Sequence, residues 1–396
     1  MHLRAPSDDE FLQDEAGEDN EVVYLNDDEV LVSESSDQDG GGDSCEDEMR
    51  DDSSVTFAMH ADVVLSIAIK GNLVISGSGD TGAVVWNAQD GDVVATLEGH
   101  DDSVSEVHLN YNEVYLATGD MSGAVIVWET VQWEKRFMLE SLDDTNLEMT
   151  WMFWHHSTNV IFRGFATGLI AMNASNGCNV KYFQGDDSEC TCGKLLADGV
   201  RLIAGYKNGL LRIWNLREAT FVVVPGSEEI FCVDVLDDRI GAKGTSNGTF
   251  ALFNVGDGAV YSTFSISQFT DTSREFGYVE TVAFDPTKSL LSVSGINCPL
   301  IFFDMQYSRA RAVFADIDGV SKALWLNNFL LTAGIDGSVH LLDRQTLEHK
   351  TEWHGHKSPI CALAVNVDRH FVVTGDEDGV CKVFRLPLTL TSTFER

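Results

Sequence analysis

The sequence lacks the segments that direct a chain to a membrane or a secretory route. No apolar run approaches the roughly 20 residues that span a bilayer, and the first 20 residues are polar and acidic, without a signal peptide. Only eight cysteines occur in 396 residues, and their spacing follows no disulfide framework. We therefore expect a soluble protein with reduced cysteines, located in the cytoplasm and also in the nucleus.

Sequence patterns for catalysis and cofactor binding are also missing. The chain contains no glycine-rich nucleotide loop and no cluster of residues with metal-ligand spacing. Cys190 and Cys192 form a C-x-C pair, but no second ligand pair accompanies them. We predict that the protein is not an enzyme and has no catalytic residues, no metal and no cofactor.

Basic residues are few, since 26 Lys and Arg face 63 Asp and Glu, a net charge of −37. Residues 1–54 hold 20 acidic and two basic residues, a net −18, which leaves −19 for the rest of the chain. Such a surface repels phosphate backbones and anionic lipids, so we expect no direct nucleic-acid or membrane binding. It attracts Lys- and Arg-rich partners. The alternative interpretation is that the acidity only maintains solubility.

The acidic first 54 residues contain few large apolar side chains and the run Gly40–Gly42. They cannot bury enough apolar surface to fold alone, so the sequence predicts a disordered acidic tail over 1–54.

From about Val55 onward the sequence repeats a pattern of apolar strands and tight polar turns. Each unit has a strand that ends in Trp or a substitute, and these anchor positions are Trp86, Trp128, Met172, Trp214, Phe253, Phe303, Leu342 and Phe384. The intervals are 42, 44, 42, 39, 50, 39 and 42 residues. Four-stranded propeller blades have a period of about 40–45 residues. The one long interval indicates an enlarged loop around Ser265–Gly277.

Gly-His pairs identify the repeat more closely. Gly99-His100 and Gly355-His356, with Met59-His60 as a variant, resemble the opening of a WD repeat. We therefore predict an all-β fold, an eight-bladed WD-repeat β-propeller over 55–387. Val55–Met59 is expected to close the ring as the outer strand of the eighth blade, with Leu388–Phe394 as a competing candidate, so 388–396 is a C-terminal tail or edge strand.

Three blades carry a set of polar residues that WD blades use for internal hydrogen bonds. These structural sets are His60, Ser76, Asp80 and Trp86 in blade one, His100, Thr118 and Trp128 in blade two, and His356, Thr374 and Asp378 in blade eight. In blade two Ser122 stands where Asp is usual, and in blade eight Phe384 replaces Trp. A His with Ser and Asp also suggests a hydrolase, but the set recurs once per blade, whereas a catalytic triad is unique.

Longer motifs resemble one WD group, the angio-associated migratory cell protein of animals and its fungal relatives. The motifs, in chain order, are Ala117–Gly123 with Val127-Trp128, Leu147-Glu148 with Trp151, Trp154 and His155, Phe183–Gly185, Thr191–Gly193, and Gly205-Tyr206 with Arg212–Trp214. The resemblance implies a dedicated chaperone in ribosome biogenesis. Such a chaperone holds the basic N-terminus of a newly made large-subunit ribosomal protein on an acidic propeller face. The alternative is a general WD scaffold in signalling, cell migration or ubiquitin-ligase assemblies.

A WD ring places the loops before each first strand, and those joining the second strand to the third, on one face. Acidic residues recur in these loops, and we predict that they contact a basic protein client: Asp101, Asp102, Asp120, Glu148, Asp186, Asp187, Glu189, Glu228, Glu229, Asp376 and Glu377. Trp151 and Trp154 either frame Glu148 for cation–π capture or fill the core of blade three. We expect the protein to be a monomer.

Overall fold

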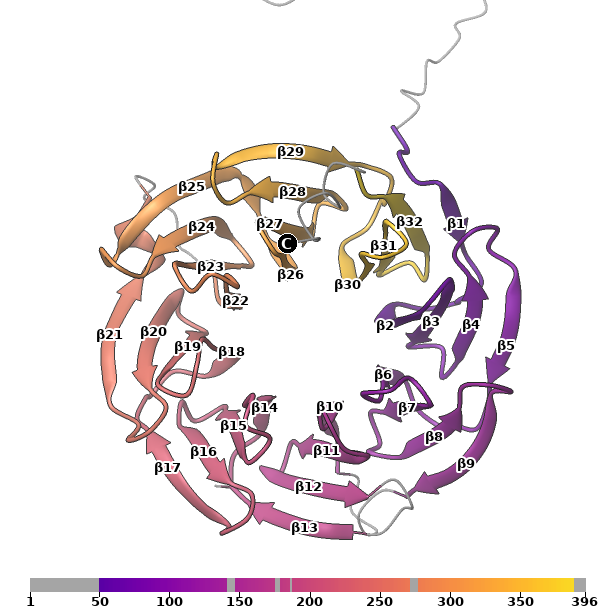
Figure 1. The fold of residues 1–396 in the computed structure, drawn as a ribbon, viewed down its shortest axis with the longest axis horizontal. Coiled ribbons are helices and arrows are strands. Elements are labelled where there is room, and N and C mark those ends of the chain that lie inside the picture. The colour runs from indigo at the N-terminus through magenta and orange to yellow at the C-terminus, as the bar shows by residue number, and fades with distance from the viewer. Residues whose placement is uncertain (1–49, 141–146, 175–178, 186, 271–276, 388–396) are drawn as a thin grey trace, which may run out of the picture. The chain divides into compact units, whose positions relative to one another are not determined.

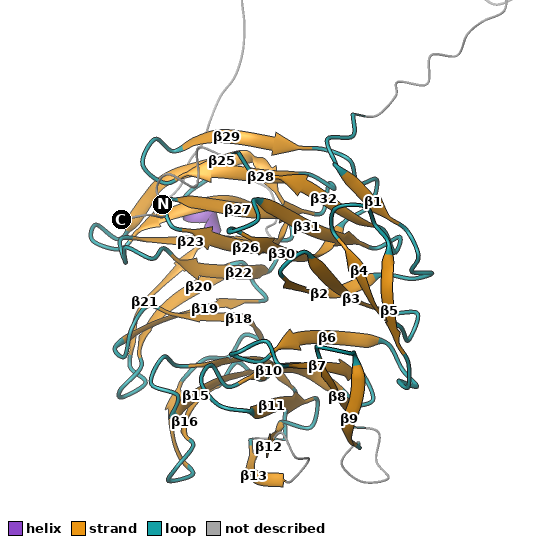
Figure 2. Cartoon of the chain, turned by 45° about the vertical axis from the view of Figure 1, so that its right-hand side comes forward, coloured by secondary structure: helices purple, strands orange, loops and turns teal. Residues whose placement is uncertain are grey.

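Eight four-stranded antiparallel sheets form the folded part of the chain, and the predicted eight-bladed propeller is confirmed. The computed structural model describes residues 50–140, 147–174, 179–185, 187–270 and 277–387. The first 49 residues of the predicted tail, Asp186 and the segment Leu388–Phe394 lie outside these ranges. Figure 1 shows the blades following one another around a central opening, and Figure 2 shows the same strands in an oblique view.

In each blade the first strand lies next to the central opening and the fourth lies at the outside. Blade one comprises β2 (Val64–Lys70), β3 (Leu73–Ser78), β4 (Ala83–Asn87) and β5 (Val93–Leu97); blade two comprises β6 (Val104–Leu109), β7 (Tyr115–Asp120), β8 (Val125–Glu129) and β9 (Glu134–Leu139). Blade three comprises β10 (Met149–Trp154), β11 (Val160–Phe165), β12 (Leu169–Ala174) and β13 (Asn179–Gln184); blade four comprises β14 (Cys190–Leu195), β15 (Arg201–Tyr206), β16 (Leu211–Asn215) and β17 (Thr220–Val224).

The second half of the ring repeats this order. Blade five comprises β18 (Ile230–Val235), β19 (Ile240–Thr245), β20 (Thr249–Asn254) and β21 (Val260–Ser265); blade six comprises β22 (Val279–Phe284), β23 (Leu290–Gly295), β24 (Cys298–Asp304) and β25 (Arg309–Asp318). Blade seven comprises β26 (Val320–Leu326), β27 (Phe329–Gly334), β28 (Val339–Asp343) and β29 (Glu348–Trp353). Blade eight comprises β30 (Ile360–Asn366), β31 (Phe371–Asp376), β32 (Cys381–Arg385) and, as its outer strand, β1 (Val55–Phe57). All eight predicted anchors lie in third strands.

The ring closes through its first strand. β1 pairs antiparallel with β32, with Val55 opposite Val383 and Phe57 opposite Cys381. The ring thus joins the start of the described chain to its last blade, as Val55–Met59 predicts. Phe57 is buried and stacks on Trp86 of blade one, with ring centroids 4.5 Å apart. This closure removes an unpaired sheet edge from the junction of blades eight and one.

A β-bulge at the start of every first strand helps adjacent blades join. The second residue of the strand is skipped in the pairing register, as between Met149 and Trp151 in β10. In blades three, four and seven the skipped residue has a hydroxyl that donates to the next blade. The Thr150 hydroxyl binds the Cys190 carbonyl at 2.5 Å, and the Ser321 hydroxyl binds that of Ile360 at 2.5 Å.

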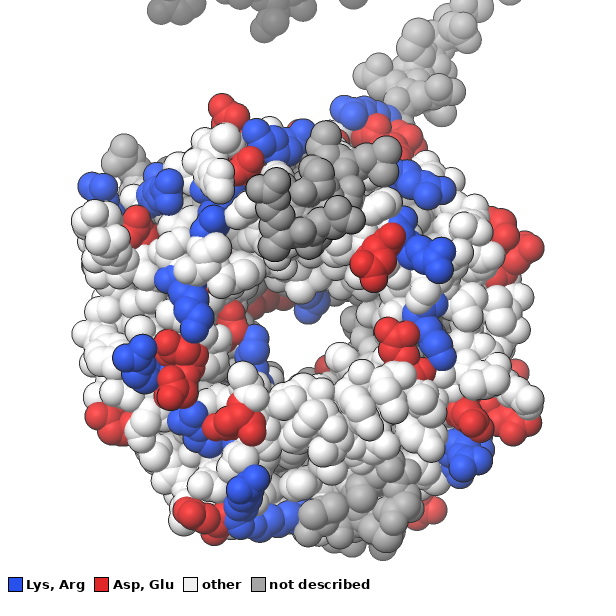
Figure 3. Space-filling model, in the orientation of Figure 1, with Lys and Arg blue, Asp and Glu red and all other residues white. Residues whose placement is uncertain are grey.

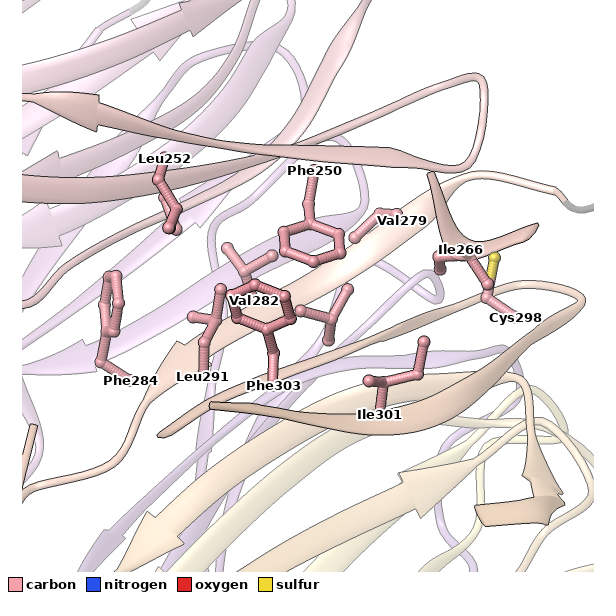
Figure 4. Close-up of a cluster of buried hydrophobic side chains, with 12 residues drawn as sticks. Phe250, Leu252, Ile266, Val279, Val282, Phe284, Leu291, Cys298, Ile301 and Phe303 are labelled. Atoms are coloured by element: carbon pink, nitrogen blue, oxygen red, sulfur yellow. The ribbon is translucent and has the colours of Figure 1, made fainter. Parts of the chain in front are cut away.

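Apolar residues of facing sheets form the cores between blades. Between blades five and six, Phe250 meets Phe303 edge-to-face at 5.2 Å, surrounded by aliphatic side chains (Figure 4). The enlarged loop predicted around Ser265–Gly277 begins with a single turn of 3-10 helix, η1 (Ile266–Gln268). Ile266 is fully buried in this core, so the inserted segment is anchored to the ring where it begins.

Candidate functional site

The loops on one face of the ring are built on buried hydrogen-bond sets in blades one and two. In blade two, His100 lies 2.7 Å from both Asp120 and the Thr118 hydroxyl, and the Trp128 indole donates to that hydroxyl at 2.8 Å. The residues His60, Ser76, Asp80 and Trp86 make the same connections in blade one. Because these groups are buried, each needs the partner that the set supplies.

The carboxylates of two sets differ from the sequence-based assignment. In blade eight Asp376, not Asp378, binds His356, with Nδ1 and Oδ2 2.6 Å apart, while the Thr374 hydroxyl lies 2.7 Å from Nε2. Asp120 takes this role in blade two. The reason is the Thr-Gly-Asp sequence, which places an acid two residues after the hydroxyl instead of four. The prediction that Asp378 completes the set is therefore wrong.

The prediction that Asp120 and Asp376 contact the client is also wrong. Their exposed fractions are 1% and 2% respectively, and both carboxylates are occupied by the blade's own histidine. Removing such a carboxylate from its histidine would leave a buried charge without its partner. These two residues stabilise the ring and do not face a partner.

Blades three to five have buried cations in the region where blades one, two and eight have the hydroxyl–histidine set. Arg163 in β11 and Lys243 in β19 occupy the strand position of Ser76, and each pairs with an alanine across the sheet. In blade four the order is reversed, because Ala204 of β15 pairs with Arg212 of β16. All three cationic side chains are at least nine-tenths buried.

The buried cations bind backbone carbonyls of the neighbouring loops. Arg163 Nη1 donates to the Gly123 carbonyl at 2.6 Å, and Lys243 Nζ donates to the Pro225 carbonyl at 3.1 Å. Burial lowers the pKa of Arg163 to about 10 and that of Lys243 to about 8. The charged form is disfavoured because the surroundings solvate it poorly. These cations were missed by the sequence reasoning, although a basic residue before glycine in an apolar strand marks both positions.

The residue immediately before the first strand occupies an equivalent place in successive blades. Its carbonyl accepts a hydrogen bond from the loop that joins the second and third strands, in blades one to five, seven and eight. We call it the entry position. The residues there are Val63, Ser103, Glu148, Glu189, Glu229, Gly319 and Pro359 in chain order. The three acidic ones occupy consecutive blades, three to five, directly beside the loops that the buried cations support.

The three entry carboxylates act on one lysine. Lys207 Nζ binds Glu189 Oε2 at 2.9 Å. Its pKa is raised above the ordinary value by the bond and charge of Glu189 first, then by the charges of Glu229 and Glu148. All three predicted contact residues thus favour a positive charge at this exposed ammonium group, and Glu189 is the one that binds it directly.

The other predicted contacts are spread more widely around the ring. Asp101, Asp187, Glu228 and Glu377 are exposed, and Asp102 is half-buried. On the face drawn in Figure 3, acidic and basic patches are distributed around the opening with uncharged surface between them. The net charge of the chain is thus not displayed as one continuous acidic sheet on that face.

The aromatics near Glu148 belong to the core of blade three. Trp151 and Trp154 are buried, with exposed fractions of 6% and 7%, and the Trp154 indole donates to the His108 carbonyl at 2.9 Å. Glu148 itself is exposed in the loop before β10. Of the two interpretations of these tryptophans, the structure supports the core.

The thiols of the C-x-C pair lie within the blades. Burial raises the pKa of Cys190 and raises that of Cys192 to about 12, so both stay protonated. Over the described ranges, no group of three or more His, Cys, Asp or Glu is placed to hold a metal ion. No helix in the described part of the chain has the length and apolar character to cross a bilayer.

Comparisons with known proteins agree with the propeller fold. Residues 91–129 and 347–385 match the model of the WD domain, G-beta repeat. The angio-associated migratory cell protein of Homo sapiens is 30% identical over 352 residues, covering 84% of this chain and 80% of the relative. The ribosome assembly protein SQT1 of Saccharomyces cerevisiae is 23% identical, covering 94% and 93%. A crystal structure of Chaetomium thermophilum Sqt1 bound to the N-terminus of ribosomal protein L10 superposes with a TM-score of 0.74 at 19% identity, covering 85% of this chain and all of that one.

Proposed function

The chain belongs to the family of the angio-associated migratory cell protein, and on that basis we propose that it is a ribosome-assembly chaperone. It holds the basic N-terminal segment of a newly made large-subunit ribosomal protein until that protein is delivered. A fungal relative is named as a ribosome assembly protein. A structural neighbour was crystallised with such a segment.

The observation that carries the proposal is that the charges of Glu148, Glu189 and Glu229 all favour the ammonium form of Lys207, which Glu189 binds directly. A Lys or Arg of the client takes the place of Lys207 among these carboxylates. Exposed ion pairs contribute only about 0–1 kcal/mol each, so the cluster supplies steering and register, and apolar contacts supply the remaining affinity. The remaining predicted contacts within the described residues, Asp101, Asp102, Asp187, Glu228 and Glu377, attract the client from other parts of the ring.

Cells that express tagged protein provide the test. Affinity purification followed by mass spectrometry should recover one basic large-subunit ribosomal protein, and its yield should fall as the salt concentration rises. Depletion of the protein should impair large-subunit assembly. Recovery of several non-ribosomal partners without an assembly defect would contradict the proposal and favour a scaffold in signalling, cell migration or ubiquitin-ligase assemblies.

A further inference from the structure

Two buried lysines lie in corresponding rows of different blades. In blade five, Lys243, Ala251 and Thr263 pair directly across β19, β20 and β21. In blade eight the corresponding row across β31, β32 and β1 contains Lys382, paired on its outer side with Thr56. Both lysines are more than nine-tenths buried. The two rows therefore end in the same outer residue, a threonine, and each contains one ammonium group.

The ammonium group of Lys382 is neutralised by a carboxylate from outside the blade's four strands. Lys382 Nζ binds Asp51 Oδ2 at 2.5 Å and Thr56 Oγ1 at 3.1 Å. Burial alone would raise the pKa of Asp51, but its bonds to Lys382 and Ser53 hold it below the ordinary value. Asp51 belongs to the segment that precedes β1. A polypeptide segment can thus supply the counter-charge for a lysine in this row.

Lys243 has a different set of partners. Its Nζ donates to the carbonyls of Pro225 at 3.1 Å and Gly209 at 3.5 Å. Among the described residues no carboxylate lies within ion-pair distance. Burial of an ammonium group without a counter-ion is costly, and it lowers the pKa of Lys243 to about 8. A ligand carboxylate would relieve that cost.

Small residues make the approach to both lysines possible. A Cβ atom at Gly226 would lie 2.6 Å from Lys243 Nζ, and one at Gly355 would lie 2.6 Å from Asp51 Oδ1. Both glycines stand in the loop that leads into a first strand. Gly226 keeps the loop close to the ammonium group, as Gly355 keeps its loop close to the Asp51–Lys382 pair.

A cavity of about 260 Å³ opens beside Lys243. Its lining residues include Pro225, Gly226, Lys243, Ala251 and Thr263. The alanine side chain leaves room in the row, and the threonine hydroxyl corresponds to the one that binds Lys382 in blade eight. Glu228 also lines the cavity and disfavours a ligand with more than one negative charge.

We propose that the cavity beside Lys243 is a subsite for one carboxylate group, presented by a polypeptide segment as Asp51 is presented to Lys382. Lys243 supplies the charge and Thr263 a hydroxyl donor. That the polypeptide is the basic client, with one acidic side chain in register, rests on the proposed function. The subsite then favours clients that have an acidic side chain at that position. The entry carboxylates alone would repel such a side chain.

Acetate serves as the probe of the subsite itself. In full-length protein labelled with 13C at lysine Cε, the Lys243 resonance is assigned by its loss in Lys243→Met. Its titration midpoint near 8 in sodium chloride should rise by about one pH unit in sodium acetate of equal ionic strength. The Lys382 resonance, already paired with Asp51, should not respond. An unchanged Lys243 midpoint, or a larger shift in phosphate than in acetate, would overturn the proposal.

A pair of Arg- and Lys-rich peptides tests the role of the subsite in client binding. The two peptides of a pair are identical except at one position, where one has Glu and the other has Gln. A series of such pairs places this position at successive points along the peptide. At one position the wild type should bind the Glu peptide about threefold more tightly. Lys243→Met and the cavity-filling Ala251→Leu should abolish this preference, and Lys243→Arg should keep it. Equal binding of both peptides at every position would contradict the subsite. Failure of all peptides to bind, with the acetate response intact, would contradict the proposed function alone.

Discussion

Blades eight, one and two differ from blades three, four and five in the residue at one internal position of the second strand, the position of Ser76 in blade one. The first group fills it with a hydroxyl bound to a histidine, as Thr118 binds His100. Blades three and five place a cation there, Arg163 and Lys243, and blade four places Arg212 on the neighbouring strand; all three blades carry an acid at the entry position. The histidine sets satisfy every polar group internally and make that sector a structural clamp around the ring closure. The cations support loops whose carboxylates face outward, so that sector is suited to binding.

The largest effect should come from a histidine set. Asp376→Ala should lower the free energy of unfolding by about 3 kcal/mol, because it leaves the buried His356 without its partner. Its neighbour in the same turn, Asp378→Ala, should change it by less than about 0.5 kcal/mol since that side chain is exposed. Urea unfolding of both variants makes the comparison. Equal effects of the two substitutions would mean that Asp376 is not the carboxylate that stabilises His356.

Lys243 should show the opposite sign of effect on stability. Lys243→Met should raise the unfolding free energy by roughly 2 kcal/mol at pH 7, because it removes a buried charge. The folded pKa of about 8 lies below that of a free lysine. The charge therefore destabilises the folded state fully below pH 8, and the cost disappears as the pH rises toward about 10.4. Thermal unfolding of both proteins between pH 7 and 10.5 should show the difference shrinking; a constant difference would contradict this account.

The pairing of Asp51 with Lys382 predicts a loss of stability in acid. Asp51→Asn should cost about 1 kcal/mol at neutral pH, a small value because the carboxylate is 44% exposed and screened by solvent. The folded pKa of Asp51 is lowered. The stabilisation is therefore present above the unfolded value of about 3.9 and is lost as the pH falls through the folded value. Wild type and variant should converge below that range, and Ser53→Ala should have a weaker effect.

The smallest effect concerns Lys207. Lys207→Ala should strengthen binding of an Arg-rich peptide about twofold to threefold, because it removes the cation that competes for Glu189. Isothermal titration calorimetry at low salt measures the change. Lys357→Ala, at an exposed position before β30, serves as the control and should have no such effect. Weaker binding by Lys207→Ala would mean that the lysine helps the client and does not compete with it.

The sequence predicts the ring well because its period depends on strand and turn chemistry repeated in every blade. Trp86, Met172 and Leu342 occupy equivalent third strands although the residue type varies. Pairings that depend on loop geometry were less accessible. Asp120 follows the hydroxyl residue Thr118 by two positions, whereas Asp80 follows Ser76 by four. Only the three-dimensional structure shows that His100 still reaches Asp120. The convergence of three entry carboxylates on Lys207 joins residues about 40 positions apart, so sequence spacing alone suggested the face but not the cluster.

The central claim is that the entry carboxylates of blades three to five hold a basic segment. Two triple reversals of equal charge test it: Glu148, Glu189 and Glu229 to Lys, and Asp101, Asp102 and Glu377 to Lys. Affinity for the N-terminal peptide of the ribosomal protein recovered from cells should fall at least about tenfold, or 1.4 kcal/mol, in the first variant. In the second it should fall less than about threefold, mainly through slower association. Unchanged affinity in the first variant, or a larger loss in the second, would contradict the account.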